Sequence, residues 1–431
     1  MPGRKLLVVQ VAALGYEFLT QGIGGTAWEG FRFRKAQSLF PALTCPVQAT
    51  MRTGLPPSGH GMVMNGFYDR TLRKPLFWEQ SSALVSGARL WNGCKRAGIG
   101  MLFWQQSLGE DADILLSPAP VHKHGGGMVE AVYSRPEGLY AGLVGKIGRR
   151  FRLSSYWGPR ASVKATAWIA KATGLVTAGP EAPDLLFTYL PHLDYDLQRY
   201  GPGSAQAGKA LADLLDLLKE LLDTARGNGY DAAVYGDYSI DAVHIPVHPN
   251  RRLCERGLMR TRPIGRRLYP DFHYSRAFAV ADHEIAHVYT TGTGAADAAA
   301  EALAGLEGVH EILRGEALEA AGIAHANTGD LVLVAEPGAW FAYPWWEDPG
   351  EAPDYASHID IHNKPGYDPC ELFFGRHPFV VSTDPARIGG SHGRTGPGTE
   401  IAWTSTFEPQ GEIGDLPALA RMIRHTMGGT A

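Results

Sequence analysis

The chain has 431 residues, which exceeds the usual size of one domain, so we expect one large α/β domain with insertions or two domains. Apolar residues make up 45% and charged residues 19%, as in an ordinary globular protein with an ample core. The net charge of −4 argues against a surface that binds a nucleic-acid polymer. The four cysteines are scattered without paired spacing, which disfavours a disulfide framework or a zinc cluster of the CxxC kind.

The N-terminal segment "KLLVVQV" is too short to span a membrane, and its β-branched residues suit a buried strand better than a signal peptide. No later segment reaches about 18 uninterrupted apolar residues. We therefore expect a cytoplasmic protein that does not act at a membrane.

The elements in chain order alternate between strands and helices. Leu6–Val11, Asp184–Leu190 and Ala232–Gly236 are short apolar runs, as expected for strands that are buried on both faces. Between the last two, leucines from Leu211 to Leu222 repeat at a spacing of three and four, which predicts a helix that ends at the glycines after Ala225. A strand, a helix and a strand in this order indicate a crossover unit of a mostly parallel sheet.

Two further regions depart from this pattern. Residues 66–165 are irregular and rich in aromatic side chains, and we expect this insertion to cover one edge of the main sheet. Residues 286–334 read as "AHVYT" strand, "AADAAAEALAGL" helix, "HEIL" strand, a short helix and "DLVLVA" strand. With its flanks, about 265–345, this region is predicted to form a small α/β cap subdomain.

Several polar residues follow the predicted strands. Asp194 and Asp196 come after the strand that ends at Leu190, and Asp237 follows Gly236. Ligands of open α/β sheets bind outside the carboxyl ends of the strands, so these carboxylates are expected in one crevice. Thr44 lies just before a proline that is favoured in the first turn of a helix, where the positive helix end would help to deprotonate a hydroxyl.

Thr44 is therefore a candidate nucleophile, and Asn65, in the glycine-rich turn that follows, is a candidate stabiliser of the charge that develops. The alternative is a loop and a short helix whose polar residues face water. Arg160, in "YWGPR", is a candidate clamp for a phosphate group, and its alternative is a surface salt bridge.

These segments carry a resemblance to a known family. "PALTCPVQATMRTGLPPSGHGMVMN" resembles the nucleophile segment of the alkaline phosphatase superfamily, in the type I phosphodiesterase/nucleotide pyrophosphatase branch near phosphonoacetate hydrolase. "YLPHLDYDLQRYGP", "GDYSI", "GDLVLVAEPGAWF" and "DIHNKPGYDP" are similar to later segments of the same group. The resemblance implies an alkaline-phosphatase-like, three-layer α/β fold over residues 1–431, with a mostly parallel central sheet and helices on both faces.

The resemblance also implies a hydrolase in which two cations, usually zinc, lie about 4 Å apart and activate a threonine nucleophile. Thr44, Asn65, Asp194 and Asp237 match the family's pattern. Three other ligand positions depart from it, because they hold Ala12, Gln198 and Tyr238 in place of an aspartate and two histidines. The last histidine of the pattern has two candidates, His392 in "GGSHGR" and His362 in "DIHNKPGYDP".

A site depleted in this way is expected to hold at most one tightly bound cation, zinc or else manganese or iron, on the side of Asp194 and His392 or His362. Gln198 and Tyr238 are weak candidate ligands. Substitute ligands are also available, namely His192, Asp196, His244, His248, Asp282, His283, Asp360 and His362.

Two functions remain open at this stage. One is a metal-assisted hydrolase or transferase that acts through Thr44 on a small anionic substrate, either a phosphate or phosphonate ester or a nucleotide-type phosphodiester. The other is a degenerate family member that keeps the fold and the crevice for ligand binding or for a different biosynthetic reaction. The sequence leaves the oligomeric state open.

Overall fold

The main sheet forms the larger part of the molecule in the computed structural model, which describes residues 5–94, 98–124, 127–409 and 411–428. Eight strands of this described part pair in the order β11-β8-β7-β12-β1-β13-β24-β4. Neighbours from β8 to β13 run parallel, while β11, β24 and β4 pair antiparallel at the two ends. The strands are β1 (Lys5–Val11), β4 (Arg34–Ala36), β7 (Ile99–Leu102), β8 (Ile114–Pro118), β11 (Val132–Arg135), β12 (Leu185–Leu190), β13 (Tyr230–Gly236) and β24 (Ile401–Ser405).

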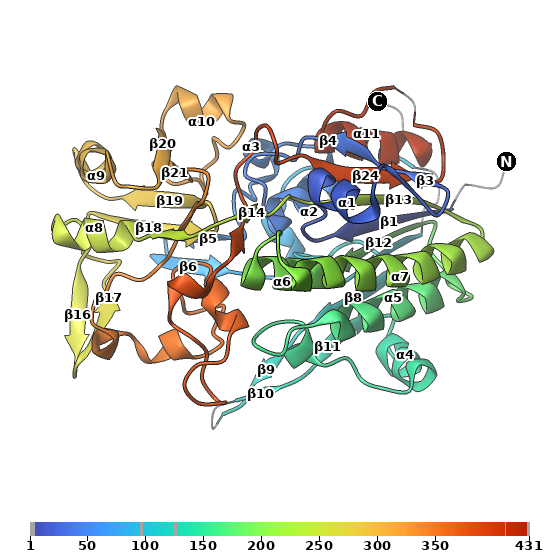
Figure 1. The fold of residues 1–431 in the computed structure, drawn as a ribbon, viewed down its shortest axis with the longest axis horizontal. Helices are drawn as coiled ribbons and strands as arrows, with labels where there is room; N and C mark the ends of the chain where they lie inside the picture. Colours follow the sequence, from blue (N-terminus) through green and yellow to red (C-terminus); the bar gives the residue numbers. More distant parts are fainter. Residues whose placement is uncertain (1–4, 95–97, 125–126, 410, 429–431) are drawn as a thin grey trace.

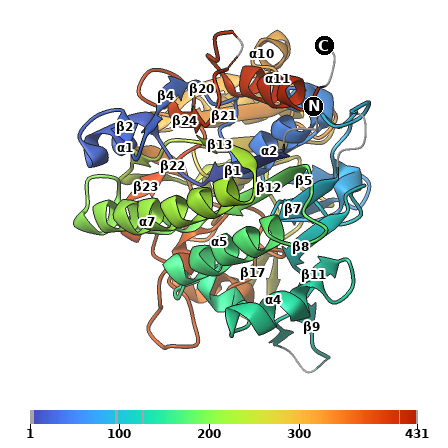
Figure 2. The same cartoon turned by 90° about the vertical axis from the view of Figure 1, so that its right-hand side faces the viewer.

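Helices cover both faces of this sheet, so the three-layer arrangement expected from the sequence is confirmed (Figures 1 and 2). Alternate residues of β1 face opposite cores, because Leu7 and Val9 pack with α5 and α7 while Leu6 and Val8 pack with α2 and α11. Figure 2 shows α11 and α2 above the sheet and α7 and α5 below it. The helices are α1 (Tyr16–Ile23), α2 (Thr44–Thr53), α5 (Val163–Thr177), α6 (His192–Tyr200), α7 (Ala205–Gly227) and α11 (Leu416–Thr426).

A second, smaller sheet lies to the left of the main one in Figure 1. Its strands pair antiparallel in the order β18-β19-β21-β20, and they are β18 (Ala277–Asp282), β19 (Ile285–Thr290), β20 (Val309–Leu313) and β21 (Leu331–Ala335). The helices α8 (Pro249–Glu255), α9 (Ala295–Leu303) and α10 (Glu316–Ala320) belong to the same part. The five elements predicted between residues 286 and 334 are all present.

The segment 66–165 is more regular than its sequence indicates. Its short apolar runs "IGML" and "ILLSP" form β7 and β8, which extend the main sheet beyond β12. The rest of the segment forms β5 (Gly66–Asp69), β6 (Lys74–Phe77), β9 (Val121–His122), β10 (Met128–Val129), β11 and the helix α4 (Leu139–Ile147). The segment therefore builds one end of the sheet.

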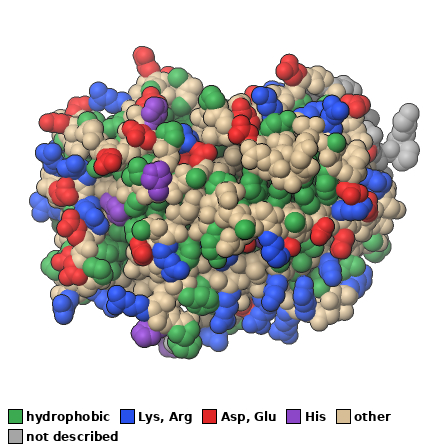
Figure 3. Space-filling view, in the orientation of Figure 1, with side chains coloured by type: hydrophobic (Ala, Val, Ile, Leu, Met, Phe, Trp, Pro, Cys, Tyr) green, Lys and Arg blue, Asp and Glu red, His purple; other side chains and the backbone are tan. Residues whose placement is uncertain are grey.

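The remaining short elements join these layers. They are β2 (Ala27–Trp28), β3 (Phe31–Arg32), α3 (Pro57–His60), β14 (Asp241–Ala242), β15 (Ile245–Val247), β16 (Thr261–Ile264), β17 (Arg267–Pro270), β22 (Ala339–Phe341) and β23 (Gly390–Ser391). In the described ranges, no helix has the length and apolar character needed to cross a membrane. Figure 3 shows acidic and basic side chains mixed over one face of the molecule.

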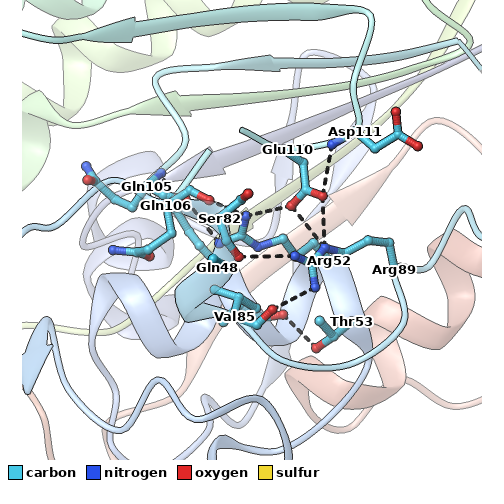
Figure 4. A network of polar contacts seen from close by, with 12 residues as sticks. Gln48, Arg52, Thr53, Ser82, Val85, Arg89, Gln105, Gln106, Glu110 and Asp111 are labelled. Carbon is cyan, nitrogen blue, oxygen red and sulfur yellow. Dashed lines mark hydrogen bonds and ion pairs between the residues drawn. The ribbon is translucent and has the colours of Figure 1, made fainter. Parts of the chain in front are cut away.

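A buried ion network ties α2 to the loops beside it (Figure 4). The guanidinium of Arg52, in the last turn of α2, is fully buried and lies 3.1 Å from a carboxylate oxygen of Glu110. Arg52 also donates to the carbonyl of Gln106 at 2.6 Å, and Arg89 donates to both oxygens of Glu110. Because α2 begins at Thr44, this network fixes the helix that carries the candidate nucleophile.

Candidate active site

The central strands of the main sheet end close to one another. Ala12 follows β1 directly, Asp237 follows β13 directly, and Asp194 lies in the first turn of α6 after β12. The backbone N–H of Ala13 donates to Asp237 Oδ1 at 3.0 Å, and the hydroxyl of Tyr238 donates to Asp194 Oδ1 at 3.0 Å. The ends of β1, β12 and β13 therefore lie close together, as the sequence predicts, and Asp194 and Asp237 are buried there.

Thr44 is the first residue of α2, as its position before Pro46 predicts. The N-cap residue is a leucine without a capping side chain, so the N–H groups of the first turn depend on other partners. The Oγ1 atom of Thr44 lies 3.5 Å from Asp237 Oδ2, at the limit of a hydrogen bond. The threonine hydroxyl is thus placed between a positive helix end and a carboxylate.

Asp237 is fully buried and is held from several sides. Its Oδ1 accepts from the backbone N–H groups of Ala13 and Tyr238, and its Oδ2 accepts from Gln10 Nε2 at 2.8 Å. Burial raises the pKa of Asp237 from 3.8 to about 8, although the hydrogen bonds from Ala13 and Gln10 oppose the shift. A carboxyl group with this pKa exchanges a proton near neutral pH.

Asp194 is also buried, and both of its oxygens accept hydrogen bonds from side chains. Tyr238 donates to Oδ1, and Gln198 Nε2 donates to Oδ2 at 2.6 Å. Gln198 Oε1 in turn accepts from the hydroxyl of Tyr367 at 2.9 Å. Burial raises the pKa of Asp194 to about 7, against the effect of the Tyr238 and Gln198 hydrogen bonds.

Asn65 joins the start of α2 to the small sheet. Its Oδ1 accepts from the backbone N–H of Cys45 at 3.0 Å, and its Nδ2 donates to Asp282 Oδ1 at 3.1 Å. The backbone N–H of Asn65 donates to Asp282 Oδ2 at 2.7 Å. The amide is therefore fixed next to Thr44, which is the place expected for a group that stabilises charge on the substrate.

Asp282 ends β18, and His283 begins the turn to β19 with a φ of +62°, a strained value for a residue with a side chain. Asp282 Oδ1 lies 2.7 Å from His283 Nδ1, so the imidazole donates from that nitrogen. From the sequence, both residues are only two of several possible substitute ligands. The available signal was their position at the end of the buried strand "AFAVAD", which Asp282 closes and His283 follows.

Four aromatic rings contact one another beside Asp194. The ring centroid of His283 lies 3.7 Å from that of Tyr367 and 3.9 Å from that of His392. The ring of His392 lies parallel to that of Tyr238, with 3.4 Å between their centroids. His392 Nδ1 is 2.8 Å from the carbonyl of Ala42, so this nitrogen is a donor. Burial lowers the pKa of both histidines well below 6.5, so both imidazoles are neutral at pH 7.

Of the two candidates for the last histidine, the structure brings only His392 into this cluster. His362 contacts the carbonyl of Phe77 through Nδ1, and within the described ranges it makes no hydrogen bond to Thr44, Asp194 or Asp237.

The other candidates lie outside the cluster as well. Asp360 binds Asn363, Asp196 pairs with Arg199, His192 contacts the carbonyl of Ala210, and Arg160 is exposed in the turn before α5. The hydrogen bonds of the described residues do not join Arg160, His244 or His248 to Thr44.

The donor set does not fit the cation pair that the family resemblance implies. Ala12 offers no ligand atom, and Gln198 and Tyr238 act as hydrogen-bond donors toward Asp194. Among the residues that the structure describes, no group of three His, Cys, Asp or Glu side chains is arranged to hold a metal ion. The single cation predicted beside Asp194 and His392 lacks a third ligand, because these described residues form no such group of three. We therefore derive no chemistry through a metal.

The raised pKa of Asp237 predicts a dependence of stability on pH. A carboxyl group whose pKa is raised by folding stabilises the fold below its unfolded pKa, and this contribution is lost as the pH rises toward the folded value. We expect the free energy of unfolding to fall between about pH 4 and pH 8, with a slope of at most about 1.4 kcal/mol per pH unit from this group. Asp237→Asn should flatten that slope in urea unfolding, and parallel curves for the two proteins would refute the assignment.

Asn65 gives a second prediction. Asn65→Ala removes the acceptor for Cys45 N–H and the side-chain donor to Asp282. We expect kcat for a phosphoester to fall about 10²–10³-fold, as for the loss of one oxyanion donor, with a smaller change in KM. Steady-state kinetics test this, and a kcat within about twofold of the unmodified protein would exclude the role.

A mostly parallel sheet between helical layers, together with a threonine at a helix N-terminus facing a buried aspartate, defines an alkaline-phosphatase-like α/β protein. Residues 16–368 match the family model of type I phosphodiesterase/nucleotide pyrophosphatase, and the chain belongs to this family. This membership supports phosphodiester hydrolysis as the general class of activity. No curated protein sequence matches the chain.

Solved structures of low sequence identity share the fold. Phosphonoacetate hydrolase from Sinorhizobium meliloti 1021, in complex with phosphonoformate, has a TM-score of 0.63 at 15% identity, covering 100% of this chain and 96% of that chain. Murine ectonucleotide pyrophosphatase/phosphodiesterase 5 has a TM-score of 0.59 at 15% identity, covering 99% and 96%. The human form has a TM-score of 0.60 at 14% identity with the same coverage.

Proposed function

We propose that this protein transfers the phosphoryl or phosphonyl group of a small anionic ester to Thr44 and then to water or another acceptor. The observation that carries the proposal is the contact of Thr44 Oγ1 with Asp237 Oδ2, at 3.5 Å, at the N-terminus of α2. The match to the phosphodiesterase family supports the same class of substrate.

In the first step, Asp237 Oδ2 takes the proton of the Thr44 hydroxyl while Oγ1 forms a bond to phosphorus. The bond from phosphorus to the ester oxygen breaks, and that oxygen leaves with a proton returned from Asp237 or taken from solvent. In the second step, an acceptor such as water attacks phosphorus, the bond to Oγ1 breaks, and Thr44 regains a proton. The same residues therefore serve a hydrolase or a transferase.

Two groups next to Thr44 suit the charge that develops on phosphorus. In the first turn of α2, the N–H of Thr44 and the positive end of the helix dipole remain for this charge, because Pro46 has no N–H and the N–H of Cys45 donates to Asn65 Oδ1. The side chain of Asn65 is held beside the same turn by Cys45 and Asp282. Preorganised donors of this kind stabilise a developing anion without reorganisation.

The alternative is a protein that binds such an ester without turning it over. It is favoured by the burial of the site, because Thr44, Asp194 and Asp237 each have at most 5% of their surface exposed and the carboxylates already accept hydrogen bonds. Binding without turnover in the unmodified protein would support this alternative.

The test compares Asp237→Asn with Asp213→Asn, which changes a partly exposed aspartate paired with Lys209 on α7. The probes are bis(4-nitrophenyl) phosphate and 4-nitrophenyl phenylphosphonate. We expect Asp237→Asn to lower kcat about 10²–10⁴-fold and Asp213→Asn to leave it unchanged. Turnover of the unmodified protein should rise from pH 6 toward pH 8 as Asp237 loses its proton. Equal losses in both variants, or no loss in either, would overturn the role of Asp237.

A further inference from the structure

We propose that hydrogen-bond donors of this chain have taken the place of the family's two cations, so that the site around Thr44 assembles without a divalent metal. The inference concerns the site assigned in the proposed function, but it does not depend on turnover. It rests on the direction of the hydrogen bonds that reach Asp194 and Asp237.

Around Asp194, the replacing residues form a chain of donors that runs in one direction. The hydroxyl of Tyr367 donates to Gln198 Oε1, which leaves Gln198 Nε2 facing Asp194 Oδ2 at 2.6 Å. The amide orientation is therefore set by Tyr367, because the opposite orientation would place an NH₂ group against a hydroxyl donor and an oxygen against a carboxylate. The hydroxyl of Tyr238 donates to the other oxygen of Asp194.

Near Asp237, Ala12 stands where the family pattern has an aspartate. The side-chain amide of Gln10 contacts Asp237 instead. Gln10 Nε2 donates to Asp237 Oδ2, and Gln10 Oε1 accepts from the hydroxyl of Tyr235 at 2.8 Å. This repeats the arrangement at Asp194, in which a tyrosine hydroxyl orients a glutamine whose amide nitrogen faces the aspartate. The two aspartates thus share one construction, a tyrosine and a glutamine in series.

His392, the remaining residue of the family's ligand pattern, is held between two rings. Tyr238 lies parallel to it on one side, and His283 contacts it at 3.9 Å. Tyr238 stands where the pattern has a histidine, and it stacks on His392 while donating to Asp194. A cation at this place would have to displace the tyrosine from both contacts.

These contacts determine what the binding of a dication would cost in free energy. A buried carboxylate needs either an opposite charge or several hydrogen bonds, and both aspartates have the latter. A dication would compete with these donors for the carboxylate oxygens, and each hydrogen bond lost would leave a buried amide or hydroxyl without a partner, at about 1–3 kcal/mol for each group. Among the described residues, too few side chains could bind the cation to offset this loss of hydrogen bonds.

The direct test is the metal content of protein produced with zinc, manganese and iron in the growth medium and purified without chelator. We expect less than about 0.1 equivalents of each metal per chain, and a Tm that neither EDTA nor added zinc changes, since a ligand stabilises only the state that binds it. About one or more equivalents of a metal that survives gel filtration, or a fall in Tm on adding EDTA, would overturn the proposal.

A converse variant restores the family's ligands. The combined Ala12→Asp, Gln198→His and Tyr238→His variant should gain zinc and a rise in Tm with zinc concentration, and Gln198→His alone replaces it if the combined variant does not fold. Tyr367→Phe is the matched control, because it removes the hydroxyl that orients Gln198 without adding a ligand, and it should stay free of zinc. A folded ligand-restored variant that binds no more zinc than the control would contradict the substitution. These readouts need no turnover, so an inactive protein that is free of metal would refute the proposed function alone.

Discussion

Thr44→Ala is expected to reduce turnover of a phosphate or phosphonate ester by about 10³-fold or more, because it removes the atom that bonds to phosphorus. The change should leave stability almost intact, since the hydrogen bond from the Thr44 hydroxyl to Asp237 is long, at 3.5 Å. Thr44→Ser keeps a hydroxyl at the same place and should retain turnover within about tenfold. Steady-state kinetics with thermal unfolding of all three proteins measure both effects.

The pair of variants separates chemistry from folding. A Thr44→Ala protein with near-normal turnover would rule out a covalent threonine intermediate, whatever the fate of Asp237. Equal losses in Thr44→Ala and Thr44→Ser, accompanied by a lower Tm, would show that the residue acts through packing at the start of α2.

Glu110→Ala is expected to lower the free energy of unfolding by about 3–5 kcal/mol, the range for breaking a buried ion pair by removing one partner. Arg52 would keep its charge in a fully buried place and lose its carboxylate, and Arg89 would lose both of its contacts to Glu110 (Figure 4). Since Arg52 belongs to α2, the helix that begins at Thr44 should also become less ordered. Chemical unfolding and hydrogen exchange of α2 test the two effects.

The control is Glu408→Ala, which breaks the pair with Arg34 at the surface, where 93% of the glutamate side chain is exposed. Exposed pairs contribute about 0–1 kcal/mol, so the control should unfold almost as the unmodified protein does. If Glu110→Ala costs no more than Glu408→Ala, the network in Figure 4 does not fix α2.

The central layer of the fold could be predicted from the sequence because its pattern is local. β1, β12 and β13 are continuous apolar runs, and the leucines of α7 repeat at helical spacing. β7 and β8 were not identified within the segment 66–165, because each has only four or five residues and lies among aromatic side chains that do not repeat with a strand period.

The candidate site could be predicted in part. The places of Thr44, Asp194 and Asp237 follow from strand ends and from a proline in a first turn, which are features of neighbouring residues. The contact of Asn65 with Asp282 joins residues 217 positions apart, and that of Tyr367 with Gln198 joins residues 169 apart. No periodicity encodes such contacts, since they depend on how the two sheets pack.

The sequence pattern also could not decide between His392 and His362. Both lie in glycine-containing loops of the C-terminal part, and the packing of Tyr238 and His283 against His392 separates them. The donor roles of Gln198 and Tyr238 were also outside the sequence pattern, which shows a missing ligand but not the direction of the hydrogen bond that replaces it.

Transfer of the phosphonyl group to Thr44 can be measured directly. The experiment is peptide mapping of the protein after brief reaction with 4-nitrophenyl phenylphosphonate and quenching in acid. We expect a phenylphosphonyl group on the peptide that contains Thr44. The group should be localised to the Thr44 hydroxyl and absent from Thr44→Ala. Release of 4-nitrophenol with the adduct on another residue, or turnover without any adduct under conditions that trap a slow second step, would contradict it.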